Sequence, residues 1–368
     1  MSAAARSPAR TPMRWQIGTL AGVPVYLGAS WAVVAVVITY LFGPTVQNLI
    51  PGIGIGGYAV AAFFAVLLLL SVLVHEAAHA LVARRYGFTV QRIVADFWGG
   101  HTAYQGDQSK PGAAAAVAVA GPLANGALAL IGWLLLQNLD QGVPWLLLSG
   151  FTFANGFVAV FNLLPGLPLD GGFLLEALVW RITGSRGIGT MAAGWAGRLL
   201  VFLLVFYAVG IPLAAGQSPQ LFRIIWVALI AMFLWAGASQ AVRAGRSRRR
   251  FEVITIGSVW RPVVHVPASA SVEDVPWSQA PLWLVTDERG QPFGIVDERA
   301  VAAVPTYGAA GTTVSAVSAR QPLGWVVDGA PEDSVLDVVS SMQAMQSPVV
   351  AIRTADGQVP AVIFAADL

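Results

Sequence analysis

The chain has no cysteine, few charged residues and only four histidines. The absence of cysteine from its 368 residues excludes disulfides, cysteine-ligated zinc and iron–sulfur clusters. Charged residues make up 11% of the chain, whereas about 25% is ordinary for a soluble domain. Hydrophobic residues make up 56%, which excludes a disordered chain. Only one short arginine cluster stands out, which argues against nucleic-acid binding. Because cysteine is absent, any bound metal must be held by His, Asp or Glu.

The charges are divided unevenly along the chain. Residues 1–250 contain 16 basic and 6 acidic residues, and residues 251–368 contain 5 basic and 13 acidic residues. The basic part also holds every long apolar run. We therefore expect a cytoplasmic N-terminal segment over 1–22, a membrane domain over 23–245 and a soluble acidic domain over 251–368.

Six apolar runs are long enough to cross a membrane, since a spanning helix needs about 20 apolar residues. They lie at 23–42, 58–82, 112–137, 145–167, 192–215 and 221–242. Arginine and lysine gather before the first run, after the second, after the fourth and after the sixth. By the positive-inside rule, this pattern predicts six spans with both termini in the cytoplasm. We expect the membrane to be a bacterial plasma membrane.

Ionisable residues occur in the second run at His75, Glu76 and His79. Such residues are costly inside a bilayer and therefore indicate function. Positions four apart share one helical face, so both imidazoles can bind one cation. Glu76 can act as a general base on a metal-bound water. The spacing predicts a metal site within a membrane helix.

A hydrolytic zinc site uses three protein ligands and one open position. The candidates for the third ligand in the membrane part are His101, Asp96, Asp107, Asp140, Asp170 and Glu176. The topology places Asp140 on the external side, too far from the cytoplasmic end of the second span. Asp170 follows the fourth span, where prolines at 165 and 168 interrupt the helix and two glycines allow a turn. Asp170 is therefore the favoured third ligand.

Four motifs follow one another along the apolar part. His-Glu-Ala-Ala-His at 75–79 is followed by Trp-Gly-Gly-His at 98–101 and Ala-Gly-Pro-Leu-Ala-Asn at 120–125. The sequence Asn-Leu-Leu-Pro-Gly-Leu-Pro-Leu-Asp-Gly then begins at 162. With these motifs, the chain resembles the site-2 protease family of intramembrane zinc proteases over about residues 20–240.

The resemblance implies a role for each matching residue. His75, His79 and Asp170 would bind one zinc ion per chain, and Glu76 would be the catalytic acid and base. Asn162 would lie near the substrate carbonyl and donate a hydrogen bond to the developing oxyanion. The implied partners are membrane lipid and membrane-spanning or membrane-anchored protein substrates, cut near the cytoplasmic side in regulated intramembrane proteolysis.

The sequence leaves two alternative roles for Asn155 and for the pair Gly121 and Asn125 in the spans. Asn155 lies one heptad before Asn162, so it either contacts substrate or bonds a neighbouring helix. Gly121 and Asn125 are four apart on the third run, where close packing against the zinc helix is favoured over catalysis.

A stretch rich in aromatic and β-forming residues follows the second span. It contains Gly99, Gly100 and His101 and indicates a short hairpin. The edge of such a hairpin could pair with an extended substrate, which matters because a helical substrate hides its scissile bond. These three residues are candidate substrate-binding residues, with His101 an alternative zinc ligand.

The acidic part contains an internal repeat. Residues 281–296 align with residues 348–363 at a constant offset, and each copy reads as strand, glycine turn, strand. A helix is expected before each copy, at 272–277 and at 331–345. This repeat resembles a pair of cystathionine-β-synthase (CBS) motifs. The expected fold is therefore a polytopic α-helical membrane domain with a soluble α/β CBS-pair-like domain in the cytoplasm.

Many CBS pairs hold an adenine nucleotide through a Thr or Ser and an Asp after the last strand. The equivalent residues here are Asp297, Ala300, Phe364 and Asp367. Only Asp367 matches the residue types that bind the nucleotide in such pairs. The resemblance therefore implies a nucleotide-binding role for Asp367 alone. Docking of a cytoplasmic partner, gating of the membrane domain and a homodimer contact are the alternatives.

Two other protein classes would use the same polar groups, namely a metal-binding membrane transporter and a non-catalytic membrane scaffold. A transporter is expected to show symmetric span pairs with a broken helix in both halves, and the sequence shows one break, at 165–168. The presence of Glu76 argues against a scaffold. The sequence favours a zinc endopeptidase.

Overall fold

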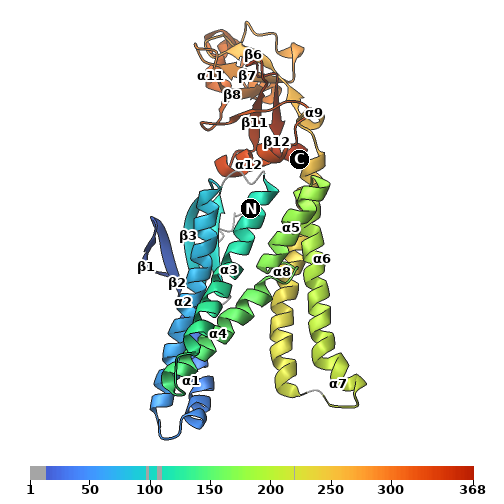
Figure 1. Cartoon of the computed structure of the whole chain (residues 1–368). Helices are drawn as coiled ribbons and strands as arrows, with labels where there is room; N and C mark the ends of the chain where they lie inside the picture. The colour runs from blue at the N-terminus through green and yellow to red at the C-terminus, as the bar shows by residue number, and fades with distance from the viewer. Residues whose placement is uncertain (1–13, 97–98, 106–109, 219) are drawn as a thin grey trace, which may run out of the picture. The chain divides into compact units, whose positions relative to one another are not determined.

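The computed structural model describes residues 14–96, 99–105, 110–218 and 220–368. The chain divides into two compact units, Met1–Arg246 and Ser247–Leu368. The first unit is helical with one small sheet, and the second is built from short strands and helices (Figure 1).

Six helices within the described residues are long and apolar enough to cross a membrane, as predicted. They are α1 (Ser30–Leu49), α2 (Gly56–Arg85), α3 (Pro111–Leu136), α4 (Val143–Asn162), the run Arg186–Ala214 and α8 (Leu221–Val253). The run Arg186–Ala214 comprises α6 (Arg186–Val205), the π-helical turn η1 (Phe206–Gly210) and α7 (Ile211–Ala214). Large apolar side chains such as Phe153 and Phe202 are exposed on these helices, as a lipid environment allows.

The first span begins later than predicted. Residues 23–28 form the strand β2 (Val23–Gly28), and α1 starts only at Ser30. β2 pairs antiparallel with β1 (Arg14–Leu20) across a turn at Ala21 and Gly22, which both have positive φ. A hydropathy window cannot separate a short apolar strand from the start of a helix, and this caused the error. The fourth span likewise ends at Asn162, five residues before the predicted end.

The predicted hairpin after the second span is present. It consists of β3 (Thr89–Asp96) and β4 (Gly99–Gln105), and His101 pairs with Val94. β2 runs parallel to β3, which gives a sheet with the order β1-β2-β3-β4. Val23 and Ile93 of the sheet pack on Ala80 of α2. In the described part of the chain, β4 is therefore an edge strand on a sheet anchored to the helix that carries both histidines.

The interruption after α4 leads into a short helix, α5 (Asp170–Thr183), which the sequence reading missed. A Cβ on Gly171 or Gly172 would collide with the backbone of residues 163–167, so both glycines permit close approach rather than a special φ. α5 is joined to α6 by a part-buried ion pair, in which Arg186 Nε donates to Glu176 Oε1 at 2.6 Å. These contacts fix the start of α5, where Asp170 lies.

The second unit contains two four-stranded sheets of matching topology. One has the order β6-β7-β8-β9, formed by Val264–Pro267, Leu282–Thr286, Pro292–Asp297 and Ala319–Arg320. The other has the order β10-β11-β12-β5, formed by Val326–Asp328, Val349–Arg353, Ala361–Phe364 and Arg261–Pro262. In each sheet the first two strands are parallel and the others antiparallel. The repeat in the sequence therefore folds as two equivalent halves.

The helices of this unit are short. They are α9 (Ile256–Val259), η2 (Trp277–Gln279), α10 (Glu298–Ala302), η3 (Thr306–Gly311), α11 (Val314–Val317), α12 (Leu336–Met345) and η4 (Ala365–Asp367). The helix expected at 331–345 is present as α12. The prediction of a helix at 272–277 is wrong, because that segment forms turns that lead into η2.

Candidate metal centre and active site

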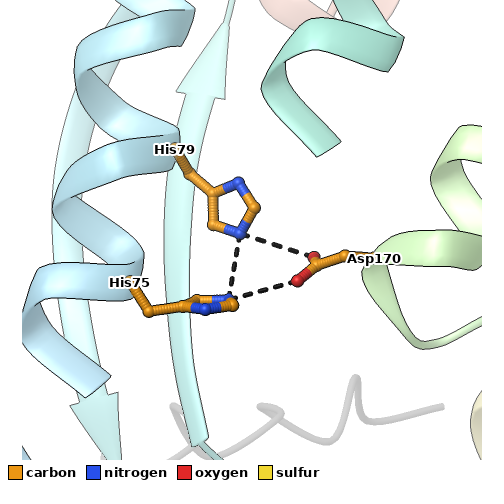
Figure 2. Close-up of side chains that lie close together, drawn as sticks. All are labelled: His75, His79 and Asp170. Atoms are coloured by element: carbon orange, nitrogen blue, oxygen red, sulfur yellow. Dashed lines mark hydrogen bonds and ion pairs between the residues drawn. The ribbon is translucent and has the colours of Figure 1, made fainter. Parts of the chain in front are cut away.

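Three side chains from α2 and α5 converge on one point. His75 and His79 lie one turn apart on α2, and Asp170 is the first residue of α5. Figure 2 shows both imidazoles turned toward the Asp170 carboxylate. The two Nε2 atoms are 3.1 Å apart, and they lie 3.1 Å and 3.4 Å from the nearest oxygens of Asp170. All three residues can each offer one ligand atom to a single metal ion.

The Nδ1 atoms of both imidazoles are hydrogen-bonded to oxygen acceptors on α3. Nδ1 of His79 donates to the backbone carbonyl of Val117 on α3, at 2.7 Å. Nδ1 of His75 is hydrogen-bonded to Oδ1 of Asn125, also on α3. An oxygen acceptor requires the proton on Nδ1, so in the neutral rings both Nε2 atoms carry lone pairs. Oδ2 of Asp170 is buried and accepts no hydrogen bond within the described residues. Three electron-rich atoms thus face one another, an arrangement that a cation stabilises.

The separations of these atoms fit zinc. With ligand bonds of about 2.0–2.1 Å and tetrahedral angles, two ligand atoms should be about 3.3–3.4 Å apart. The observed separations of 3.1–3.4 Å match that spacing. Two imidazoles and one carboxylate also form a donor set that catalytic zinc sites use, with the fourth position open.

Gly121 of α3 makes room for the two imidazoles. A Cβ at this position would lie 2.5 Å from Nε2 of His75, where a side chain cannot fit. The close approach of α3 to α2, expected from the spacing of Gly121 and Asn125, is therefore observed at the two Nε2 atoms that could hold a metal.

A cavity of about 410 Å³ opens beside the three residues. Its lining includes His75, Asp170, the buried Glu76 and Asn162, the last residue of α4. Trp31 of α1, Phe233 of α8 and other apolar residues complete the wall. The sequence candidates for acid–base chemistry and for contact with the substrate carbonyl thus share one cavity with the metal-binding group.

The other candidate ligands lie elsewhere or outside the described side chains. Glu176 is paired with Arg186, and Asp140 is exposed in the turn between α3 and α4. The side chains of Asp96 and His101 are outside the described part of the structure, as is residue 107. Gly99, Gly100 and His101 form the start of β4.

Sequence reasoning missed how α3 and α4 support His75. Asn125 contacts the ring directly, and Asn155 bonds to Asn125 rather than standing free in the cavity. Ser71, one turn before His75, was not singled out, although it bonds Asn155. Its position one helical turn from a metal-binding histidine was the available signal.

Comparison with known proteins settles the family. The model of peptidase family M50 matches residues 63–145 and 137–207. Rip3 of Mycobacterium tuberculosis, named as a zinc metalloprotease, is 30% identical over 96% of this chain and 91% of its own length. The chain belongs to peptidase family M50. This M50 peptidase is also 28% identical to the zinc metalloprotease sll0528 of Synechocystis, over 79% of this chain and 78% of the relative.

The solved structures that match this M50 peptidase are less similar to it in sequence than these relatives. The site-2 protease from Methanocaldococcus jannaschii matches 62% of this chain and 95% of its own, with 23% identity and a TM-score of 0.44. The CBS domain of a bacterial CNNM/CorC family Mg²⁺ transporter matches 33% of this chain and 76% of its own, with 13% identity and a TM-score of 0.27. Family membership rests on the M50 relatives. It makes the protein a multi-pass membrane metalloprotease of the site-2 type whose metal is zinc.

The second unit of this M50 peptidase places Asp367 in an ion pair. Nε and Nη2 of Arg261 donate to its two carboxylate oxygens at 2.8 Å and 2.5 Å. The hydrogen bonds from Arg261 hold the pKa of Asp367 below its ordinary range. Arg261 also stacks on Phe364, and both line a cavity of about 700 Å³. A nucleotide that used Asp367 would have to compete with Arg261.

Proposed function

We propose that this M50 peptidase hydrolyses peptide bonds of membrane-spanning or membrane-anchored proteins at the site formed by His75, His79 and Asp170. The observation that supports the proposal is the convergence of three ligand atoms at the spacing of a tetrahedral zinc site. Zinc held there would act as a Lewis acid, making a water more acidic and polarising the scissile carbonyl.

In this proposal Glu76 is the residue that accepts a proton from the water and later donates it. It is buried, lines the same cavity and lies in the helical turn between the two histidines, directly after His75. Its carboxylate takes a proton from the attacking water and then delivers it to the leaving amine, so one group serves as base and then as acid.

Asn162 binds the substrate carbonyl in the proposal. It is the last residue of α4, at the start of the irregular loop over residues 163–169. Its side-chain amide donates a hydrogen bond to the carbonyl oxygen as negative charge develops there. Such a donor stabilises the transition state more than the ground state.

The substrate is bound as an added strand. The edge strand β4, which begins with Gly99, Gly100 and His101, has backbone groups that can pair with an extended segment. Pairing would hold the segment unwound, with its peptide bonds open to attack. Asn155, the other candidate for substrate contact, is instead engaged with Asn125 and Ser71.

The orientation of the protein follows from its charges. Loops with Arg and Lys are placed in the cytoplasm, together with both termini and the acidic second unit, in a bacterial plasma membrane. The second unit then modulates cleavage in regulated intramembrane proteolysis. Adenine nucleotide binding at Asp367 and homodimer formation remain predictions from the resemblance to CBS pairs.

The test compares wild type with Glu76→Gln in the purified full-length protein. Cleavage of a panel of single-span peptides should fall by at least ~10²-fold in the variant, since general acid–base catalysis contributes ~10²–10⁴-fold. Bound zinc should stay at about one ion per chain. Asp140→Asn, in the exposed turn between α3 and α4, is the control and should cleave like wild type. Unchanged cleavage by Glu76→Gln would refute the proposed mechanism.

A further inference from the structure

A chain of hydrogen bonds leads from His75 through three helices. His75 Nδ1 is bonded to Oδ1 of Asn125 on α3. Nδ2 of Asn125 donates to Oδ1 of Asn155 on α4 at 2.7 Å, and Nδ2 of Asn155 donates to Oγ of Ser71 on α2 at 3.0 Å. The four side chains are buried, with exposed fractions of 8% or less.

The direction of this chain is fixed at its far end. Ser71 Oγ donates to the carbonyl of Leu67 at 3.1 Å, so its hydrogen is used and its lone pairs face Asn155. Nδ2 of Asn155 also donates to the carbonyl of Phe151 at 2.8 Å, and a carbonyl can only accept. The amide of Asn155 therefore has one satisfied orientation, in which Oδ1 faces Asn125.

That orientation determines the next two groups. With Oδ1 of Asn155 as its neighbour, Asn125 must present Nδ2 to Asn155 and Oδ1 to His75. An oxygen facing Nδ1 of His75 requires the proton on Nδ1, so Nε2 keeps the lone pair that points at His79 and Asp170. If Asn155 were absent, the amide of Asn125 could rotate and offer Nδ2 to the ring. That would favour the proton on Nε2, the form that cannot bind metal.

We infer that Asn155 and Asn125, anchored by Ser71, are positioning residues that hold His75 in the tautomer that binds zinc. The inference rests on the proposed function, because it takes His75 as a zinc ligand. His79 needs no such relay, since its Nδ1 donates to the Val117 carbonyl, which cannot rotate to present a donor. The two ligands from α2 thus differ: one is oriented by the backbone, the other by a side-chain relay.

The relay explains why two asparagines lie in apolar helices at these positions. Buried amides cost free energy unless every polar atom is bonded, and here Asn155 bonds through both its oxygen and its nitrogen. A role in joining helices alone would also satisfy these atoms. The two roles differ in their effect on zinc affinity, which only positioning predicts.

The first measurement is zinc affinity of the full-length protein in detergent, by competition with a chelator. Asn155→Leu should weaken zinc binding by about 10–100-fold, the usual loss for a residue that orients a metal ligand. Thr152→Val, one turn earlier on α4, is the matched control. It replaces a buried hydroxyl that has no hydrogen-bond partner within the described residues, and it should bind zinc like wild type.

The second measurement repeats Asn155→Leu in an Asn125→Asp background. Both oxygens of an ionised Asp at 125 can only accept, so His75 stays in the tautomer with the proton on Nδ1 however that side chain rotates. There Asn155→Leu should change zinc affinity less than about 3-fold, whereas loss of the contacts of Asn155 with Ser71 and the Phe151 carbonyl, which do not involve residue 125, would act in both backgrounds. Asn155→Ala serves in the same cycle if the leucine variant does not fold.

The outcomes separate the two proposals. Equal zinc affinity of wild type and Asn155→Leu, or an equal loss in both backgrounds, would overturn the relay and leave the zinc site intact. A wild-type protein that binds no zinc through His75 would instead overturn the proposed function. Lower thermal stability with unchanged zinc affinity would assign Asn155 to helix packing and also refute the relay.

Discussion

Gly121 of α3 lies against the imidazole of His75 on α2, so close that a Cβ on Gly121 would be 2.5 Å from the metal-binding nitrogen. The third helix therefore forms one wall of the metal centre. It supplies three elements to that centre: the space at Gly121, the Val117 carbonyl for His79 and the Asn125 amide for His75.

Gly121→Ala should abolish zinc binding and cleavage while leaving the helix intact, because its methyl group would displace both imidazoles. Gly126→Ala on the same helix is the control, since a Cβ there meets nothing within 4 Å among the described residues. The zinc content per chain and the cleavage rate measure both effects. Full zinc content in Gly121→Ala would contradict the observed closeness of α3.

Asp170→Ala should lower zinc affinity by more than the ~10–100-fold expected for a residue that only orients a ligand. The variant removes one of three metal-binding groups and leaves two imidazoles. Chelator competition measures the affinity, with Asp140→Ala in the exposed turn as the control. Wild-type affinity in Asp170→Ala would remove this residue from the ligand set.

Asn162→Ala should lower kcat by about 10²–10³-fold, the cost of removing a donor to an oxyanion. Zinc affinity should stay unchanged, because Asn162 lines the cavity but is not among the three metal-binding residues. This contrast with Asn155→Leu separates a residue that contacts substrate from one that positions a ligand. A normal kcat would exclude Asn162 from catalysis.

Glu176→Leu should destabilise the first unit by at most ~3–5 kcal/mol, the cost of breaking a fully buried pair, because it removes the carboxylate from the part-buried pair with Arg186. The double variant Glu176→Leu/Arg186→Leu should recover part of this loss, since both charges of the pair are removed together. Thermal unfolding in detergent measures both. If the double variant were less stable than the single one, the pair would not be the main contact of Arg186.

Asp367 should make the stability of the second unit depend on pH. The pKa of Asp367 is lowered in the folded state by its hydrogen bonds from Arg261. The pair therefore contributes fully above the unfolded pKa of about 3.9, and its contribution is lost as pH falls through the lower folded pKa. Hydrogen exchange of residues 361–368 below about pH 4 measures this. Asp367→Asn should reduce the pH dependence of this exchange, leaving the part that Asp328 and Asp356 contribute, and an unchanged profile would contradict the assignment.

The sequence by itself determined the class of protein and the chemistry of its site. Scarce charge and six apolar runs require a membrane domain, because only helices without charges cross a bilayer at low cost. Two histidines four apart share a helical face in any α-helix, so two of the three proposed ligands followed from local geometry. The internal repeat of residues 281–296 at 348–363 likewise predicted that the second unit would contain two matching halves.

Only the tertiary structure decided what surrounds these residues. The start of α1 and the helix α5 depended on contacts with β1, β3 and α6, which a local hydropathy pattern does not contain. The third ligand and the relay join residues from different helices, as in the bond between Asn125 and Asn155. Sequence spacing defines the faces of one helix, whereas the approach of α3 to α2 depends on packing between helices. That packing decides which nitrogen of His75 holds the proton and which faces the metal.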